Sequence, residues 1–288
     1  MSIQPKNELP GSPSWTPSSL SISIVTYATD TSILAGTIES LAKAVGHARA
    51  TGFLGEVALA IVDNGPGSGV DAFLTDQIHR LWPYGLESVR HSFNTGFGAG
   101  HNKALRMVQA TYHLILNPDV VLAEDAISNA IGYMAQHPSV GCITPYACWP
   151  GGGRQYLCKE YPSVFTLFLR GFAPKAIARR FAGRLAGYEL RDVTGDAHVD
   201  DILIASGCFM FCLRRALDET GGFSDRFFLY FEDFDLCLRL VKTWRIAYVP
   251  SVRIVHLGGR ASLKGLRHIY MFIRSAVVFF RTHGWRFF

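Results

Sequence analysis

Three carboxylates lie close together in the second half of the chain, at Glu232, Asp233 and Asp235. Acidic residues at a helix start interact favourably with the helix dipole, which accounts for one or two of them. The aromatic run RFFLYF precedes them. A carboxylate beside aromatic rings is partly desolvated, so its pKa rises toward the range that suits a general base. We therefore predict a proton acceptor in this cluster.

Asn117-Pro118-Asp119 and His256 each follow an apolar, strand-like run. A divalent cation on a nucleotide diphosphate needs few protein carboxylates, because the phosphate oxygens supply other ligands. Asp119 fits that task better than it fits a cap for the helix expected at 123–134, several residues later. His256 alone is more often a packed histidine than a metal ligand.

The glycine-rich segment NTGFGAG (94–100) follows another expected strand. Glycines at such a place let the backbone approach a phosphate or a sugar, although a tight strand–helix turn needs them equally. A dinucleotide-binding fingerprint would instead follow the first strand, where Thr26-Tyr27-Ala28 contains no glycine. The sequence therefore argues against a nicotinamide or flavin cofactor.

Strands and helices alternate along the first half of the chain. Apolar, β-branched runs predict strands at 21–27, 56–62, 86–91, 111–117 and 140–144, and residues spaced three and four apart predict helices over 34–45, from about 99, and over 127–134. Such βα units imply a mostly parallel sheet with helices on both faces, and its ligands bind beyond the carboxyl ends of the strands. Those ends carry Thr26-Tyr27, Asp63-Asn64, Asn94 and Asn117-Pro118-Asp119.

The second half is less regular. We predict a partly helical insertion at about 145–200, a strand over 202–213, a helix over 231–242, and two short strands, 246–249 and 253–255, that lead to His256. Residues 1–19 form an expected flexible leader, 20–260 one domain, and 261–288 a basic, aromatic helical segment.

Composition narrows the class of protein. The chain has 288 residues, of which 49% are apolar. It has no run of 18 apolar residues, so we expect no membrane-spanning helix. Its polar amino-terminal stretch does not resemble a secretory signal. Six cysteines without a C-x-x-C pair predict free thiols in a reducing cytoplasm.

The carboxyl-terminal charge is one-sided. Residues 236–288 hold ten Lys and Arg, no Asp or Glu, and many aromatic residues. This pattern predicts peripheral contact with an anionic membrane, while an ordinary solvated helix face is the alternative. No nucleic-acid motif accompanies the charge, so we expect no nucleic-acid partner.

The order of seven segments resembles family 2 glycosyltransferases of the GT-A fold, and within them bacterial rhamnosyltransferases. The segments span about 20–260 and are SIVTY, VDNG, NTGFGAGHN, LNPDV, SGCFMF, GGFSDRFFLYFEDFDLCLRL and VPSVRIVH. The resemblance implies a Rossmann-like, mostly parallel sheet with an acceptor-side insertion.

The resemblance also implies roles for individual residues. By this resemblance Asp233 is the base, and Glu232 is its neighbour in the family's acidic pair. Asp119 and His256 are then the ligands of a Mg²⁺ or Mn²⁺ ion. Asn117 stands where the family motif has its first aspartate. The donor-binding residues are then Thr26, Tyr27, Asp63, Asn94, Gly96, Asn117, Asp119 and Arg260, with Lys264 able to add to the diphosphate contacts.

The predicted reaction is an inverting transfer of L-rhamnose from dTDP-L-rhamnose to a hydroxyl of a cell-surface glycan or a lipid-linked acceptor, at the inner face of the cytoplasmic membrane. The alternatives are a UDP- or GDP-hexose donor and a non-catalytic module that binds a sugar nucleotide. A nucleotidyltransferase is disfavoured, because the first strand lacks a basic, glycine-rich signature.

Overall fold

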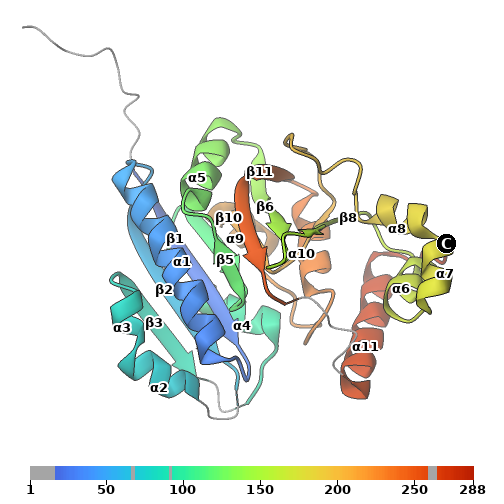
Figure 1. Cartoon of the computed structure of the whole chain (residues 1–288), viewed down its shortest axis with the longest axis horizontal. Coiled ribbons are helices and arrows are strands. Elements are labelled where there is room, and N and C mark those ends of the chain that lie inside the picture. Colours follow the sequence, from blue (N-terminus) through green and yellow to red (C-terminus); the bar gives the residue numbers. More distant parts are fainter. Residues whose placement is uncertain (1–16, 66–68, 91–92, 259–264) are drawn as a thin grey trace, which may run out of the picture.

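A nine-stranded mixed sheet organises the described part of the chain (Figure 1). The computed structural model describes residues 17–65, 69–90, 93–258 and 265–288. The strand order is β3-β2-β1-β4-β10-β6-β11-β5, with β7 paired to β6. The strands are β1 (Ser18–Thr26), β2 (Leu54–Asp63), β3 (Gly85–Arg90), β4 (Tyr112–Leu116), β5 (Val120–Leu122), β6 (Val140–Cys148), β7 (Arg154–Gln155), β10 (Phe209–Leu213) and β11 (Arg245–His256); β8 (Cys158–Lys159) and β9 (Ile204–Ala205) form a second, two-stranded sheet.

Parallel pairing dominates the first half of the chain, as predicted. β3, β2, β1 and β4 are parallel neighbours, and β6 is parallel to β11. β10 lies antiparallel between β4 and β6, and β5 pairs antiparallel with β11. The carboxyl ends of β1, β2, β4, β6 and β11 therefore meet at one edge of the sheet.

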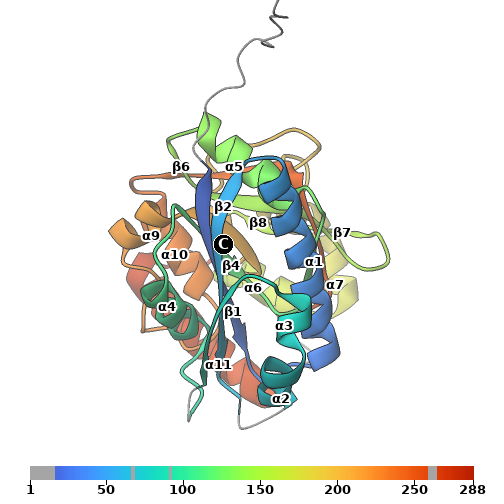
Figure 2. The same ribbon diagram turned by 90° about the vertical axis from the view of Figure 1, so that its left-hand side faces the viewer.

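Helices cover both faces of the sheet, and Figure 2 shows the sheet between the two layers. One layer holds α1 (Thr31–Ala50), α2 (Gly69–Asp76), α3 (Ile78–Leu81) and α5 (Ala126–Gln136); the other holds α4 (Phe97–Met107), α9 (Arg214–Thr220) and α10 (Glu232–Leu240). A third group packs together at one end of the molecule and comprises α6 (Val164–Gly171), α7 (Lys175–Arg180), α8 (Ala182–Tyr188) and α11 (Leu266–His283).

Helix α1 illustrates how the sequence sets these elements. Asp30 caps its start by accepting the Ser32 amide at 2.8 Å. The predicted stripe of Leu34, Ile38, Leu41 and Val45 is fully buried against the sheet. Burial of such side chains contributes about 1.5–3 kcal/mol each, which outweighs the modest helix propensity of β-branched residues.

Several boundaries differ from the prediction. β1 begins at Ser18, two residues inside the predicted leader, while residues 1–16 lie outside the described part. The single strand predicted over 202–213 is two strands, β9 and β10, separated by Ser206-Gly207-Cys208, because β9 pairs with β8 and not with the main sheet. The two strands predicted over 246–255 are one strand, β11, whose register against β6 shifts between Val249 and Arg253.

The basic segment 236–288 does not form one surface. Its first part belongs to α10 and β11, within the layers of the main domain, and only α11 and the residues after it lie in the outer helical group. No helix within the described ranges has the length and hydropathy to cross a bilayer.

Candidate active site

A cleft of about 890 Å³ opens at the carboxyl edge of the sheet. Six parts of the fold contribute to its wall: the start of α4, the β4–β5 connection, the β6–β7 turn, the break between β9 and β10, the start of α10, and the end of β11. The predicted residues that line it are Asn117, Asp119, Glu232, Asp233 and His256. The fold thus brings Glu232 and Asp233 of the predicted acidic cluster to the same cavity as the predicted cation ligands.

Asp119 and His256 are adjacent because β5 and β11 pair antiparallel. His256 is opposite Val120, and the Leu257 amide donates to the Asp119 carbonyl at 2.9 Å. His256 Nε2 lies 3.4 Å from Asp119 Oδ1. Gly258 is required beside this pair, since a Cβ there would collide with Asp119 Oδ2.

Gln155 on β7 fixes the orientation of the His256 ring. Its Nε2 donates to the His256 carbonyl at 2.7 Å, which leaves Oε1 to accept from His256 Nδ1 at 3.0 Å. With the proton on Nδ1, His256 Nε2 presents a lone pair toward Asp119. Histidine ligands of metals are held in this way by a partner on the second ring nitrogen.

This pair has the chemistry of an incomplete cation site. Asp119 Oδ1 and His256 Nε2 are both buried without a hydrogen-bond partner. Within the described ranges no group of three or more His, Cys, Asp or Glu could hold a metal ion. Two protein ligands fit a cation whose remaining ligands are diphosphate oxygens and water.

Asp233 also lines the cleft and is held in place by backbone amides. Its Oδ2 accepts from the Gly207 amide at 2.9 Å and its Oδ1 from the Phe234 amide at 3.0 Å. Burial raises the pKa of Asp233, while these two hydrogen bonds favour the charged form and limit the rise. The result is a carboxylate that is fixed, ionisable and open to the cleft.

Glu232 differs from its neighbour in its surroundings. Burial, and then the charge of Asp233, raise the pKa of Glu232 to about 8, and its Oε2 has no hydrogen-bond partner. Two adjacent carboxyl groups of this kind share one charge near neutral pH. Asp233 carries the charge because it has the amide donors, and Glu232 carries the proton.

Gly207 allows the contact with Asp233. A Cβ at this position would lie 3.2 Å from the Asp233 Cβ and 3.3 Å from the Phe97 ring. Any side chain here would push Asp233 away from the amide that holds it. The break between β9 and β10 therefore serves the site directly.

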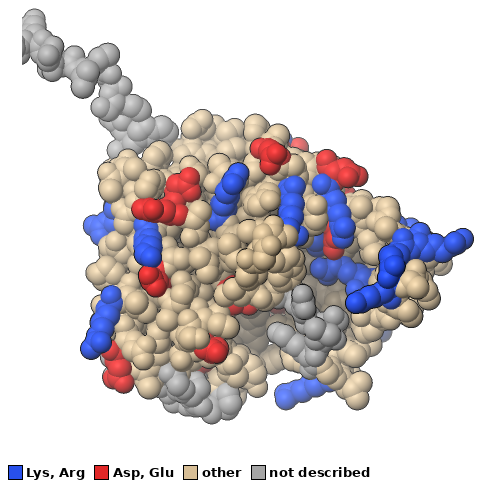
Figure 3. Space-filling model, viewed as in Figure 1, with Lys and Arg blue, Asp and Glu red and all other residues tan. Residues whose placement is uncertain are grey.

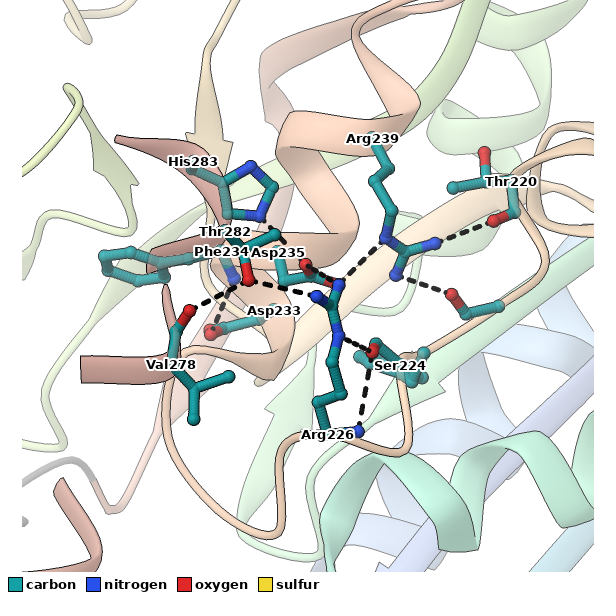
Figure 4. Close-up of polar contacts among 12 residues, drawn as sticks. Thr220, Ser224, Arg226, Asp233, Phe234, Asp235, Arg239, Val278, Thr282 and His283 are labelled. Carbon is teal, nitrogen blue, oxygen red and sulfur yellow. Dashed lines mark hydrogen bonds and ion pairs between the residues drawn. The ribbon is translucent and has the colours of Figure 1, made fainter. Parts of the chain in front are cut away.

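Asp235 has a different role from the other two carboxylates. It is fully buried, forms an ion pair with Arg239 at 2.8 Å and accepts a hydrogen bond from His283 Nε2 of α11 at 2.9 Å. Figure 4 shows this carboxylate between the two partners, together with Arg226. Asp235 joins α10 to α11 and does not line the cleft.

The ends of β1 and β2 form a second polar group, beside the cleft but not among the residues that line it. Thr26 Oγ1 donates to Asp63 Oδ1 at 2.8 Å, and the Gly65 amide donates to the same oxygen at 3.0 Å. Asp63 Oδ2 is buried without a partner, while Tyr27 is 53% exposed. This arrangement leaves one buried acceptor for a ligand that carries a hydrogen-bond donor.

The glycines of 94–100 are needed for close packing. Gly96 has φ of +91°, and a Cβ there would collide with the Phe228 carbonyl oxygen. A Cβ on Gly100 would lie 2.7 Å from the Val25 side chain, and Asn94 Oδ1 accepts the Gly96 amide at 2.8 Å. The tight turn thus accounts for these glycines, and donor contacts of Asn94 and Gly96 stay a prediction. Arg260 and Lys264 lie outside the described residues.

Sequence reasoning missed Gly207 and Gln155. An isolated glycine inside an apolar run indicates a bulge or a close backbone approach, so Gly207 could have been identified from the sequence. Gln155 has no such signal, because its role depends on the β6–β7 hairpin that places it beside His256.

Known proteins are similar to this chain in sequence and in fold. A family model described as "Glycosyltransferase like family 2" matches residues 17–268. An N-acetylglucosaminyl-diphospho-decaprenol L-rhamnosyltransferase of Mycobacterium tuberculosis is 23% identical over 246 residues, covering 80% of this chain and 76% of that protein. Rhamnosyltransferase WbbL of Escherichia coli is 24% identical over 172 residues, covering 56% of this chain and 60% of that protein.

Solved structures are similar in fold at low identity. GalNAc-T7 with UDP, GalNAc and Mn²⁺ superposes with a TM-score of 0.60 and 14% identity, over 84% of this chain and 43% of that one. Mannosyltransferase PcManGT from Pyrobaculum calidifontis, with GDP-Man and Mn²⁺, gives a TM-score of 0.58 and 17% identity, over 91% of this chain and 65% of that one. The chain thus spans less than two thirds of either solved structure.

Proposed function

The chain belongs to glycosyltransferase-like family 2 and has the GT-A fold, and on this basis we propose that it transfers L-rhamnose from dTDP-L-rhamnose, with inversion, to a hydroxyl group. The acceptor is a cell-surface glycan or a lipid-linked glycan. The names of the curated relatives, both rhamnosyltransferases, support the choice of sugar. The observation that carries the proposal is that Asp233 and the Asp119–His256 pair line the same cleft.

Asp233 is the proposed general base. It takes the proton from the acceptor hydroxyl as that oxygen attacks the anomeric carbon of the donor. The Gly207 and Phe234 amides hold the carboxylate in place, so its position does not depend on the bound acceptor. Glu232, whose pKa is raised to about 8, keeps its proton and leaves the charge on Asp233.

Asp119 and His256 are the proposed ligands of a Mg²⁺ or Mn²⁺ ion. When bound, the ion would offset the charge that develops on the leaving diphosphate. A nitrogen ligand favours Mn²⁺ over Mg²⁺, because imidazole suits softer ions. Gln155 orients the ring so that Nε2 remains free for this contact.

We assign the nucleotide to the ends of β1 and β2. Thr26, Tyr27 and Asp63 are its proposed contacts, supported by the buried, unpaired Asp63 Oδ2, which can accept from a base N–H. Asn94, Gly96, Asn117 and Arg260 are further proposed donor contacts.

The proposed location is the cytoplasm, at the inner face of the cytoplasmic membrane. The six cysteines are free thiols, five of them buried, which suits a reducing compartment.

A thermal-shift panel of sugar nucleotides, each with and without Mn²⁺, tests the proposal. Ligand at about 100 times its Kd adds about 2.7 kcal/mol to the free energy of unfolding. We expect dTDP-L-rhamnose with Mn²⁺ to raise Tm most, and Asp119→Asn to remove the Mn²⁺-dependent part. A larger shift with UDP- or GDP-hexoses would overturn the rhamnosyl assignment, and donor binding without release of free nucleotide on addition of acceptors would indicate a binding module.

A further inference from the structure

Two segments that are far apart in the sequence form one surface at the end of the molecule. Residues 161–188, with α6, α7 and α8, pack against residues 265–288, with α11 and the carboxyl-terminal tail (Figure 1); we call this group the helical platform. Phe172 packs edge-on against Phe272 at 6.0 Å, and the Val164 amide donates to the Arg286 carbonyl at 2.8 Å. The platform is therefore a single ordered unit.

The platform carries charge of one sign. Residues 161–188 contain five Lys and Arg, residues 265–288 contain four, and neither segment contains Asp or Glu. In Figure 3, Lys and Arg side chains project from the end of the molecule that α6, α7 and α8 form. Arg170 is paired with Glu189 at 3.2 Å, but Arg267 and Arg274 are exposed on α11.

An apolar stripe accompanies these arginines. Leu266, Tyr270 and Ile273 are 84%, 68% and 52% exposed, and their spacing of four and three places them on one side of α11. The opposite side of α11 faces the rest of the protein: it buries Phe279 in the platform core and carries His268 and Ser275. In the other segment of the platform, Phe168 of α6, Phe172 just after it and Ile177 of α7 are also exposed.

We propose that this face of the helical platform docks on an anionic lipid bilayer. A surface helix with an apolar stripe, arginines beside it and no acidic residue binds a bilayer by burying the stripe at the headgroup boundary, while the arginines contact anionic headgroups. Nucleic acid phosphates would pair with the arginines but would leave Leu266 and Ile273 exposed to water. A bilayer satisfies both kinds of side chain.

The docking surface is connected to the cleft. Tyr230, which lines the cleft, has its hydroxyl 2.8 Å from His268 Nδ1 of α11. Ser275 Oγ of α11 donates to the carbonyl of Leu229, another cleft residue, at 2.8 Å. Docking therefore holds the cleft near the bilayer, where a lipid-linked acceptor would reach Asp233. The lipid-linked acceptor rests on the proposed function, whereas the docking itself does not.

Flotation of the full chain with vesicles tests the docking without any sugar nucleotide. We expect the protein to float with phosphatidylcholine vesicles that contain phosphatidylglycerol, and not with phosphatidylcholine alone. Arg267→Gln with Arg274→Gln should weaken partition by about fivefold per arginine. Tyr270→Ser with Ile273→Ser should weaken it as well, because the stripe is lost while the charge is kept.

The matched control is Lys43→Gln with Arg215→Gln, which removes the same charge from 65% and 74% exposed side chains on α1 and α9. This control should float like the wild type. Wild-type protein that stays unbound to anionic vesicles, or a control that loses as much partition as the platform variant, would overturn the docking. A dimer in light scattering that Ile273→Ser abolishes would also overturn it, since a second copy would then cover the stripe. Failure of docking alongside a normal Tm shift with dTDP-L-rhamnose would leave the proposed function intact.

Discussion

Replacing Asp233 by Asn changes the proposed base with the least change in shape. The amide cannot accept the acceptor proton, so we expect kcat to fall by about 10²–10⁴-fold, equivalent to about 3–5.5 kcal/mol in the activation barrier. The two backbone donors on Asp233, from Gly207 and Phe234, add a second effect. An amide has one oxygen for two donors, so one hydrogen bond is lost, which destabilises the fold by about 1–3 kcal/mol.

The assay must separate the loss of kcat from the loss of fold stability. Release of nucleotide under saturating donor and acceptor gives kcat, and the donor-induced Tm shift reports binding. Tm itself should fall by about 2–4 °C per kcal/mol for a chain of this size. We expect a large loss in kcat, a modest loss in Tm and little change in the donor-induced shift.

Glu232→Gln is the control at the adjacent position. Since Glu232 is protonated near neutral pH, the neutral amide should preserve most of the activity. A folded Asp233→Asn protein with kcat within a few-fold of the wild type would refute Asp233 as the base. A Glu232→Gln protein that loses most of its activity, together with an Asp233→Asn protein that keeps it, would assign the reverse roles to the pair.

Three further results are expected. The pKa of Glu232 is raised from 4.5 to about 8, so its contribution to stability is complete below pH 4.5 and is lost as pH rises through 8; the free energy of unfolding of Glu232→Gln relative to that of the wild type should therefore rise with pH, by about 1.4 kcal/mol per pH unit between pH 4.5 and 8. Burial lowers the pKa of His101 to about 3 and that of His113 well below 6.5, so both side chains stay neutral in the folded protein while the unfolded chain takes up protons. In the Glu232→Gln background, denaturant melts should therefore show a fall of about 2 kcal/mol in the free energy of unfolding from pH 7 to 5.5, and a flat profile would contradict this. Gln155→Leu frees the His256 ring, and Mn²⁺ titrations followed by EPR in the presence of dTDP should show about 10–100-fold weaker binding, whereas unchanged affinity would show that Gln155 does not position the ligand.

Local sequence patterns predicted the helices and strands whose buried residues form a regular stripe or an unbroken apolar run. The stripe of α1 from Leu34 to Val45 and the runs of β1 and β2 are fixed by periodicity alone, and the structure confirms them. The rule that ligands bind beyond parallel strand ends, together with the family resemblance, predicted which polar residues would meet. Asp119, Asp233 and His256 do line one cleft.

Features that depend on pairing between distant segments could not be predicted in this way. An apolar run such as 202–213 does not reveal that its first part pairs with β8 and its second part with β4. Asp235 looked equivalent to Asp233 in sequence, but its role is decided by His283, which only the packing of α11 brings near. The tautomer of His256 likewise depends on Gln155, contributed by a two-residue strand.

The position of β11 in the sheet has a consequence for the order of folding. β5 pairs with β11 only, within the described sheet, and β11 lies between β5 and β6. Asp119 is therefore synthesised early but has no fixed place until a strand made much later inserts beside it. Contacts between such distant segments form slowly, because a long loop must close first. The ends of β1 and β2, with Thr26 and Asp63, can form from the first third of the chain, while Asp119, Asp233 and His256 come together last. We therefore expect the proposed nucleotide contacts to form before the proposed cation ligands and the proposed base.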